Sequence, residues 1–213
     1  MASDSGGYLV YTGTYRGTRV TVASTGMGGP STAICMEELG ALGVDTFVRV
    51  GSCGTLQDDV DCGDIVVSTA ALRTGGVADC YLPVLFPAVP DYETTAALAY
   101  AALRLHARVH VGPCATRDAF YVDRDPNEKA LLKQAGLLAQ EMEGDIVFVL
   151  ASLWGWRAGA LFAVASPATQ RRPERCLEPF QMAENNAVRI ALEAIWELDS
   201  GATTCRDFEK GCD

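Results

Sequence analysis

Apolar residues along the chain fall into short runs that alternate with stretches of helical spacing. Residues 8–15 and 19–23 have the β-branched and aromatic content of strands, and Gly17 between them predicts a hairpin. The same reasoning predicts strands at 47–50, 63–68, 109–115 and 157–166, and helices at 31–42, 94–105, 129–134, 146–154 and 184–198. The alternation predicts an α/β fold: a single domain with a mixed, largely parallel β-sheet flanked by helices.

Other segments interrupt this pattern. Glycines and prolines between residues 73 and 90 predict a long irregular loop that could cover a site, and residues 120–126 predict a second, polar loop. Residues 1–7 and 199–213 have no periodicity, so we expect a core at 8–198 with a loose start and a mobile tail.

A charged residue interrupts the apolar run at 47–50. Arg49 is costly in a buried strand unless it has a partner or a function. Gly51 and Gly54 follow it and predict a turn with exposed backbone N–H groups, to which Ser52 adds a hydroxyl. These groups at the carboxyl end of a strand would suit an anion, but an arginine paired with a nearby carboxylate, such as Asp45, explains the pattern equally well.

Composition narrows the classes of function. The chain has 213 residues, 49% of them hydrophobic, and its net charge of -10 disfavours nucleic acid and anionic membranes as partners. Its start lacks the basic and apolar regions of a signal peptide, so we expect a soluble, cytoplasmic protein. The eight cysteines show no C-x-x-C spacing, and we interpret residues such as Cys35 and Cys114 as buried thiols and not as ligands of a metal.

Five short motifs occur in a characteristic order: Ser-Thr-Gly-Met-Gly-Gly-Pro-Ser at 24–31, Arg-Val-Gly-Ser-Cys-Gly at 49–54, Phe-Pro-Ala-Val at 86–89, Phe-Tyr at 120–121 and Glu-Met-Glu at 141–143. In this order they resemble the hexameric-type nucleoside phosphorylases. Within that family the segments 26–67 and 85–93 look most like uridine phosphorylase, whereas 11–15 and 51–54 are also similar to bacterial purine nucleoside phosphorylase.

The resemblance implies a pentosyltransferase that cleaves the N-glycosidic bond of a nucleoside with inorganic phosphate, giving a free base and ribose 1-phosphate. It implies no cofactor and no metal, since phosphate is a co-substrate. Its partners would be the nucleoside, phosphate and further copies of the chain in a homodimer or hexamer.

The resemblance also assigns roles to individual residues. Arg49 and Glu143 would be the catalytic residues: Arg49 holds phosphate together with Ser52 and the backbone at Gly51, and Glu143 holds the ribose together with Met142. The base would be contacted by Cys53, Gly54, Phe120, Arg124 and Glu141. Without the family context, Glu141 and Glu143 would be read as a solvated helix start, and Phe120 as a core residue.

Several positions depart from the family pattern. No segment matches its N-terminal strand and Gly-Asp-Pro-x-Arg turn, so only Arg49 of the family's phosphate arginines has a counterpart. Arg124 and Pro126 replace a glutamine and an arginine that bind the base in uridine phosphorylases, and Pro167 falls near the aspartate with which purine enzymes protonate the base. We therefore expect a weak catalyst, with a purine nucleoside phosphorylase or a non-catalytic binding or storage protein as the alternatives.

Overall fold

The centre of the protein is a closed five-stranded barrel. The structure is a computed structural model, and it describes residues 2–5, 8–122, 125–166 and 177–201. Around the barrel the strands follow the order β4 (Thr46–Thr55), β7 (Ala139–Glu141), β6 (Val109–Arg117), β5 (Ile65–Thr74) and β8 (Arg157–Ser166). The pairs β4–β8, β5–β6 and β6–β7 are parallel, whereas β4–β7 and β5–β8 are antiparallel. The predicted α/β domain with a mixed sheet is confirmed, and the sheet closes on itself.

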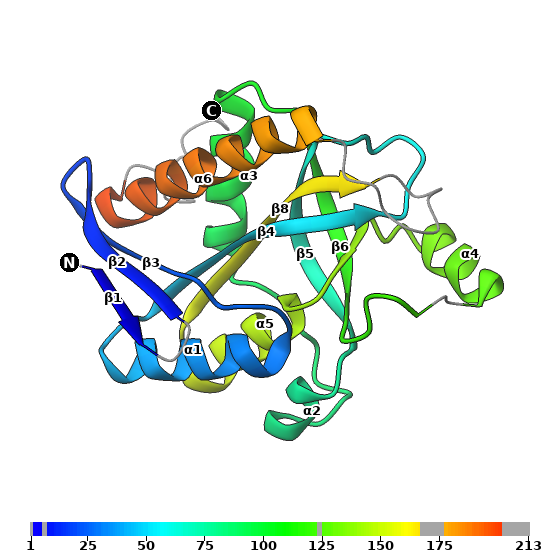
Figure 1. Cartoon of the computed structure of the whole chain (residues 1–213), viewed down its shortest axis with the longest axis horizontal. Coiled ribbons are helices and arrows are strands. Elements are labelled where there is room, and N and C mark those ends of the chain that lie inside the picture. The colour runs from blue at the N-terminus through cyan, green and yellow to red at the C-terminus, as the bar shows by residue number, and fades with distance from the viewer. Residues whose placement is uncertain (1, 6–7, 123–124, 167–176, 202–213) are drawn as a thin grey trace, which may run out of the picture.

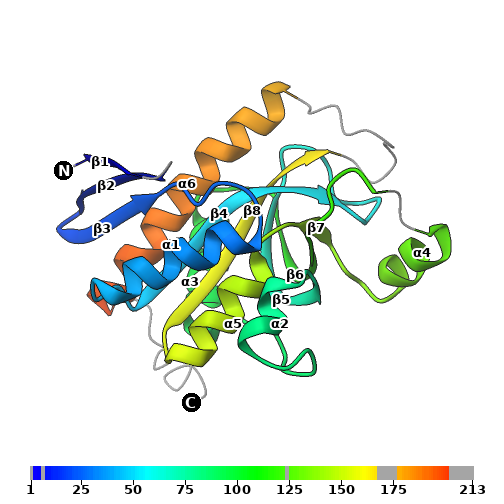
Figure 2. The same ribbon diagram turned by 60° about the horizontal axis from the view of Figure 1, so that its bottom comes forward.

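Helices cover the barrel on two sides (Figures 1 and 2). One layer contains α1 (Gly29–Ala41), α2 (Val77–Tyr81) and α5 (Gly144–Trp154), and the other contains α3 (Tyr92–Arg104) and α6 (Leu177–Ser200). Each layer has its own apolar core against the strands, the first around Phe148 and Phe162 and the second around Leu98 and Ile190. The short helix α4 (Pro126–Gln134) lies to the side of the barrel and has no buried residue.

A separate three-stranded antiparallel sheet stands beside the barrel (Figure 2). It consists of β1 (Ala2–Ser5), β2 (Tyr8–Tyr15) and β3 (Thr18–Ala23), and the predicted hairpin turns at Arg16 and Gly17, both with positive φ. The Tyr15 hydroxyl donates to Glu193 Oε1 at 2.6 Å and joins the sheet to α6. The expectation of a loose start was wrong for Ala2–Ser5, because these residues pair with β2.

The segment between β5 and α3 is more ordered than its glycines and prolines predicted. It contains α2, and Arg73 at the end of β5 holds the turn that follows this helix. The guanidinium donates to the carbonyls of Leu82, Pro83 and Phe86 at 2.7–2.8 Å, and to Asp79 Oδ1. Arg73 thus supplies hydrogen-bond donors to three backbone carbonyls that lie outside a sheet or helix.

Other differences concern the ends of elements. β7 is only three residues long, and no periodicity marked it in advance. The polar loop before α4 is confirmed for 120–122, and its residues 123–124 lie outside the described part of the chain. Of the predicted mobile tail, Asp199 and Ser200 belong to α6. Residues 202–213 lie outside the described part of the chain. Among the helices of the described residues, none has the length and apolar character needed to cross a membrane.

Candidate active site

Arg49 lies in the middle of β4 and not at the end of a strand. The strand continues through the two glycines to Thr55, and its parallel register pairs Arg49 with Ala160 and Gly51 with Phe162 of β8. The predicted glycine turn after residue 50 is therefore wrong, although the register slips between Cys53 and Gly54. Gly51 has a steric role instead: a Cβ there would lie 2.9 Å from Arg49 Nη2, so the glycine leaves room for the guanidinium.

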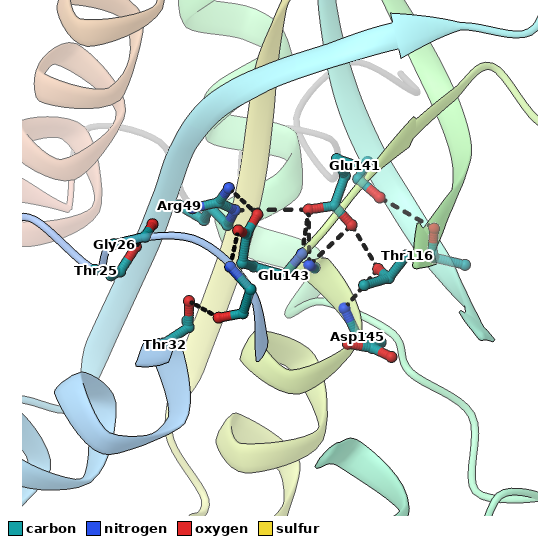
Figure 3. A network of polar contacts seen from close by, with 12 residues as sticks. Thr25, Gly26, Thr32, Arg49, Thr116, Glu141, Glu143 and Asp145 are labelled. Atoms are coloured by element: carbon teal, nitrogen blue, oxygen red, sulfur yellow. Dashed lines mark hydrogen bonds and ion pairs between the residues drawn. The ribbon is translucent and has the colours of Figure 1, made fainter. Parts of the chain in front are cut away.

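Two carboxylates meet this guanidinium (Figure 3). Arg49 Nη2 donates a hydrogen bond to Glu143 Oε2, and Arg49 Nε lies 3.6 Å from Glu141 Oε2. Nε is buried and makes no hydrogen bond among the described residues. The exposed fraction of the Arg49 side chain is 13%, so the ion pairs are shielded from most of the solvent.

Glu143 connects Arg49 to the start of α1. Its second oxygen, Oε1, accepts a hydrogen bond of 2.6 Å from the backbone N–H of Gly28, the residue that precedes α1. Gly28 has a φ of 90°, a conformation that favours glycine. Within the motif at 24–31, Gly28 is therefore the residue whose backbone reaches Glu143.

Glu141 is enclosed by donors from its own chain. It accepts hydrogen bonds from the Thr116 hydroxyl, from the backbone N–H of Glu143 at 2.8 Å, and from that of Gly144 at 2.8 and 2.9 Å. Burial raises the pKa of the Glu141 carboxyl, and Arg49 and these donors oppose that rise. The side chain of Glu141 is only 1% exposed, so its described contacts are all with residues of the protein itself.

Asp145 is the third buried carboxyl of this region and belongs to the first turn of α5. Its backbone N–H donates to the Thr116 hydroxyl at 2.9 Å, and its Oδ2 is buried without a hydrogen-bond partner among the described residues. Burial is the main cause that raises the pKa of Asp145 to about 7, and the negative charges of Glu141 and Asp118 add to it.

The remaining predicted residues differ in how far they are exposed. Ser52, Gly54 and Met142 are partly exposed, and Phe120 is 55% exposed in the loop after β6, where its ring meets Tyr121 edge to face. The side chain of Cys53 lies in the core, where burial raises the pKa of its thiol well above the usual value. Arg124 lies outside the described residues.

Sequence reasoning missed Thr116 and Gly28. Thr116 is far from Glu141 in sequence, and they meet because β6 and β7 pair in parallel with these two residues in register. A threonine near the end of a strand has no distinctive pattern, so no local signal marked it. Gly28 belonged to a quoted motif, but only the structure shows its N–H on Glu143.

The assembled groups have a defined chemical capacity. One arginine faces two carboxylates, so the cluster carries a net negative charge when all three groups are ionised. Arg49 can give bidentate hydrogen bonds to an oxyanion, and Glu143 can accept hydrogen bonds from hydroxyl groups. No three or more His, Cys, Asp or Glu side chains in the described part of the chain are grouped so as to hold a metal ion.

A helix-flanked mixed barrel with this cluster is consistent with the nucleoside phosphorylase fold. A sequence model described as the phosphorylase superfamily matches residues 2–197, and the chain belongs to this superfamily.

Several relatives are similar over most of their length. Uridine phosphorylase of Treponema pallidum (strain Nichols) is 43% identical over 199 residues, which cover 88% of this chain and 76% of that protein. Guanosine phosphorylase of Halorubrum lacusprofundi is 41% identical over 197 residues, covering 90% and 81%. Uridine phosphorylase of Escherichia coli (strain K12) is 36% identical over 195 residues, covering 85% and 77%. The chain is therefore a member of the nucleoside phosphorylases. The relatives above are named after two different nucleosides, uridine and guanosine.

Proposed function

We propose that this protein is a uridine phosphorylase-like pentosyltransferase, which cleaves a ribonucleoside with inorganic phosphate to give the free base and ribose 1-phosphate. The observation that carries the proposal is the contact between Arg49 and Glu143. It brings an anion-binding group and a hydroxyl-binding group together, as a reaction between phosphate and a sugar requires.

In this proposal Arg49 binds phosphate with help from the Ser52 hydroxyl and the backbone at Gly51. Apart from Gly54 and Thr55, the described residues show no pairing of β4 with β7, so backbone amides on that edge are candidates for further donors. Phosphate must compete with Glu143 for the guanidinium. Its binding would therefore release the carboxylate for the sugar.

Glu143 accepts hydrogen bonds from the ribose hydroxyls, and Met142 packs against the sugar. Positive charge develops on the ribose as the bond to the base breaks, and a fixed carboxylate stabilises that charge better than mobile water does. The attacking phosphate held on Arg49 then lies on the same sugar, so both subsites act on one reacting carbon.

The base subsite is less defined than the other two. Phe120 is exposed and available to stack on a base, whereas Cys53 and Glu141 are buried. Uridine is the first candidate because two of the three relatives described above are uridine phosphorylases. Guanosine is the second, because the Halorubrum relative is a guanosine phosphorylase of similar identity.

The experiment that tests the proposal is a phosphorolysis assay with uridine, 2′-deoxyuridine, inosine and guanosine. Release of base and of ribose 1-phosphate, or of 2-deoxyribose 1-phosphate from 2′-deoxyuridine, must depend on phosphate, and Arg49→Ala should raise the phosphate KM at least tenfold. Asp45→Ala, an exposed change close to the start of the same strand, is the matched control. Binding of nucleoside without any turnover would instead support a non-catalytic binding protein, and a phosphate KM unchanged in Arg49→Ala would overturn the assignment of Arg49.

We also propose that the protein assembles as a homo-oligomer, either a dimer or a hexamer. Support comes from large apolar side chains before and at the start of α3, with Leu85 92% exposed and Tyr92 70% exposed. A second copy of the chain would cover them.

A further inference from the structure

We propose that Thr116 and Glu141 are positioning residues that hold Glu143 in place, and that they thereby set the preference for ribonucleosides over 2′-deoxynucleosides. The proposal rests on the ribose role proposed for Glu143. Neither residue can touch a substrate in this structure, because both are almost completely buried, Thr116 with 1% and Glu141 with 4% of its surface exposed. Their effect would act through Glu143.

A continuous chain of hydrogen bonds connects the three residues (Figure 3). The hydroxyl of Thr116, on β6, donates to Glu141 Oε1, and Glu141 in turn accepts the backbone N–H of Glu143. The same hydroxyl accepts the N–H of Asp145 at 2.9 Å. Because these contacts lie on both sides of Glu143 in the sequence, its backbone is fixed to the barrel before and after the side chain.

The start of α5 explains why this arrangement matters. Glu143 is the residue at the N-cap of the helix, where a side chain usually accepts an N–H of the first turn, but its carboxylate makes no such bond. Glu141 accepts the N–H of Gly144 instead. The carboxylate of Glu143 is thus free to face Arg49 and the N–H of Gly28.

The chemistry of the two residues fits this task closely. Glu141 receives donors only, so a glutamine at this position would turn its NH₂ group toward a hydroxyl or an amide N–H. Gly144 also contributes, since a Cβ there would lie 2.8 Å from Glu141 Oε1. Thr116 needs its hydroxyl, which donates on one side and accepts on the other, and valine has the same shape without that group.

A small displacement of Glu143 should therefore weaken its hydrogen bonds to the 2′-hydroxyl and 3′-hydroxyl. A shift on the order of 1 Å can lower the rate about a hundredfold when a group is needed in one geometry. A 2′-deoxynucleoside lacks one of these contacts and has less to lose. The ratio of kcat/KM for ribonucleoside and 2′-deoxynucleoside is thus the quantity that reports on positioning, and a change in stability alone does not move it.

The test compares uridine with 2′-deoxyuridine, and guanosine with 2′-deoxyguanosine, in the complete chain and in four variants. Thr116→Val and Glu141→Gln should lower the ratio at least fivefold, Thr116→Ser should keep it within twofold of the parent, and Glu143→Gln serves as the reference for losing the ribose contact. Thr116→Ala replaces Thr116→Val if the latter does not fold, as judged by circular dichroism.

A lowered ratio in Thr116→Val that is restored in Thr116→Ser supports the proposal. An unchanged ratio in both Thr116→Val and Glu141→Gln, with a lower melting temperature, would reduce the two residues to an ordinary helix cap and overturn it. Failure of the underlying function looks different: there, Glu143→Gln itself leaves the ratio unchanged, whatever the other variants do.

Discussion

Replacing Asp145 by asparagine should stabilise the protein, and more so at alkaline pH. Asp145 is only 1% exposed, and one of its carboxyl oxygens has no hydrogen-bond partner among the described residues. Its pKa is raised to about 7 by burial and by the nearby negative charges, so ionisation is costly in the folded protein. Asparagine keeps the shape of the side chain and cannot ionise.

The sign and size follow from proton linkage. A raised pKa in the folded protein means that this state holds the proton more tightly than the unfolded chain does. The cost is absent below the unfolded value of 3.8, grows as the pH rises, and is complete above about 7. It amounts to about 2 kcal/mol at pH 5 and about 4 kcal/mol at pH 8.

The assay is urea unfolding at pH 5 and pH 8, followed by tryptophan fluorescence. The gain in the free energy of unfolding from Asp145→Asn should be about 2 kcal/mol larger at pH 8 than at pH 5. Taking this difference cancels any change in packing, which is the same at both pH values. Asp58→Asn, at a carboxyl that is 74% exposed, is the control and should show almost no difference. Equal gains for Asp145→Asn at the two pH values would refute the reasoning.

Three further predictions concern the site and the assembly. Gly51→Ala should raise the phosphate KM about tenfold, because the new Cβ displaces the Arg49 guanidinium, whereas Gly13→Ala, with nothing within 4 Å of its Cβ, should not. Glu143→Gln should bind phosphate at least threefold more tightly by calorimetry while its turnover falls, since a carboxylate no longer competes for Arg49; weaker binding would contradict the competition. Sedimentation at micromolar concentration should show a dimer or larger species that Leu85→Asp weakens, and a monomeric parent protein would remove the proposed interface.

The periodicity of apolar residues was sufficient to predict most of the strands and helices. The strand Arg157–Ser166 begins and ends at the predicted residues, because a long apolar run between a glycine-containing turn and a polar segment has few other solutions. β7 escaped prediction because a three-residue strand is too short for any period. Closure of the barrel was also invisible, since it depends on strands meeting that are distant in sequence, such as β4 and β7.

Only those parts of the candidate site that have local sequence features could be predicted. Arg49 and Glu143 could be proposed from the sequence because a charge within an apolar run, and a motif of known order, are local features. The sequence suggested a turn after Arg49, but the ladder with β8 outweighs the flexibility of Gly51 and keeps the strand extended. The hydrogen bond between Glu141 and Thr116 could not be predicted, because only the pairing of β6 with β7 brings the two residues together.

The two-sided arrangement of helices separates the tasks of the molecule. The charged side chains of the site come from β4, from β7 and from the start of α5, and the residue before α1 adds a backbone N–H, whereas the layer of α3 and α6 contributes none of these groups. That layer encloses an apolar core of its own, in which alanines such as Ala97, Ala187 and Ala194 are fully buried. Protein engineers could therefore tune heat resistance by repacking α3 against α6, away from the cluster of Arg49, Glu141 and Glu143.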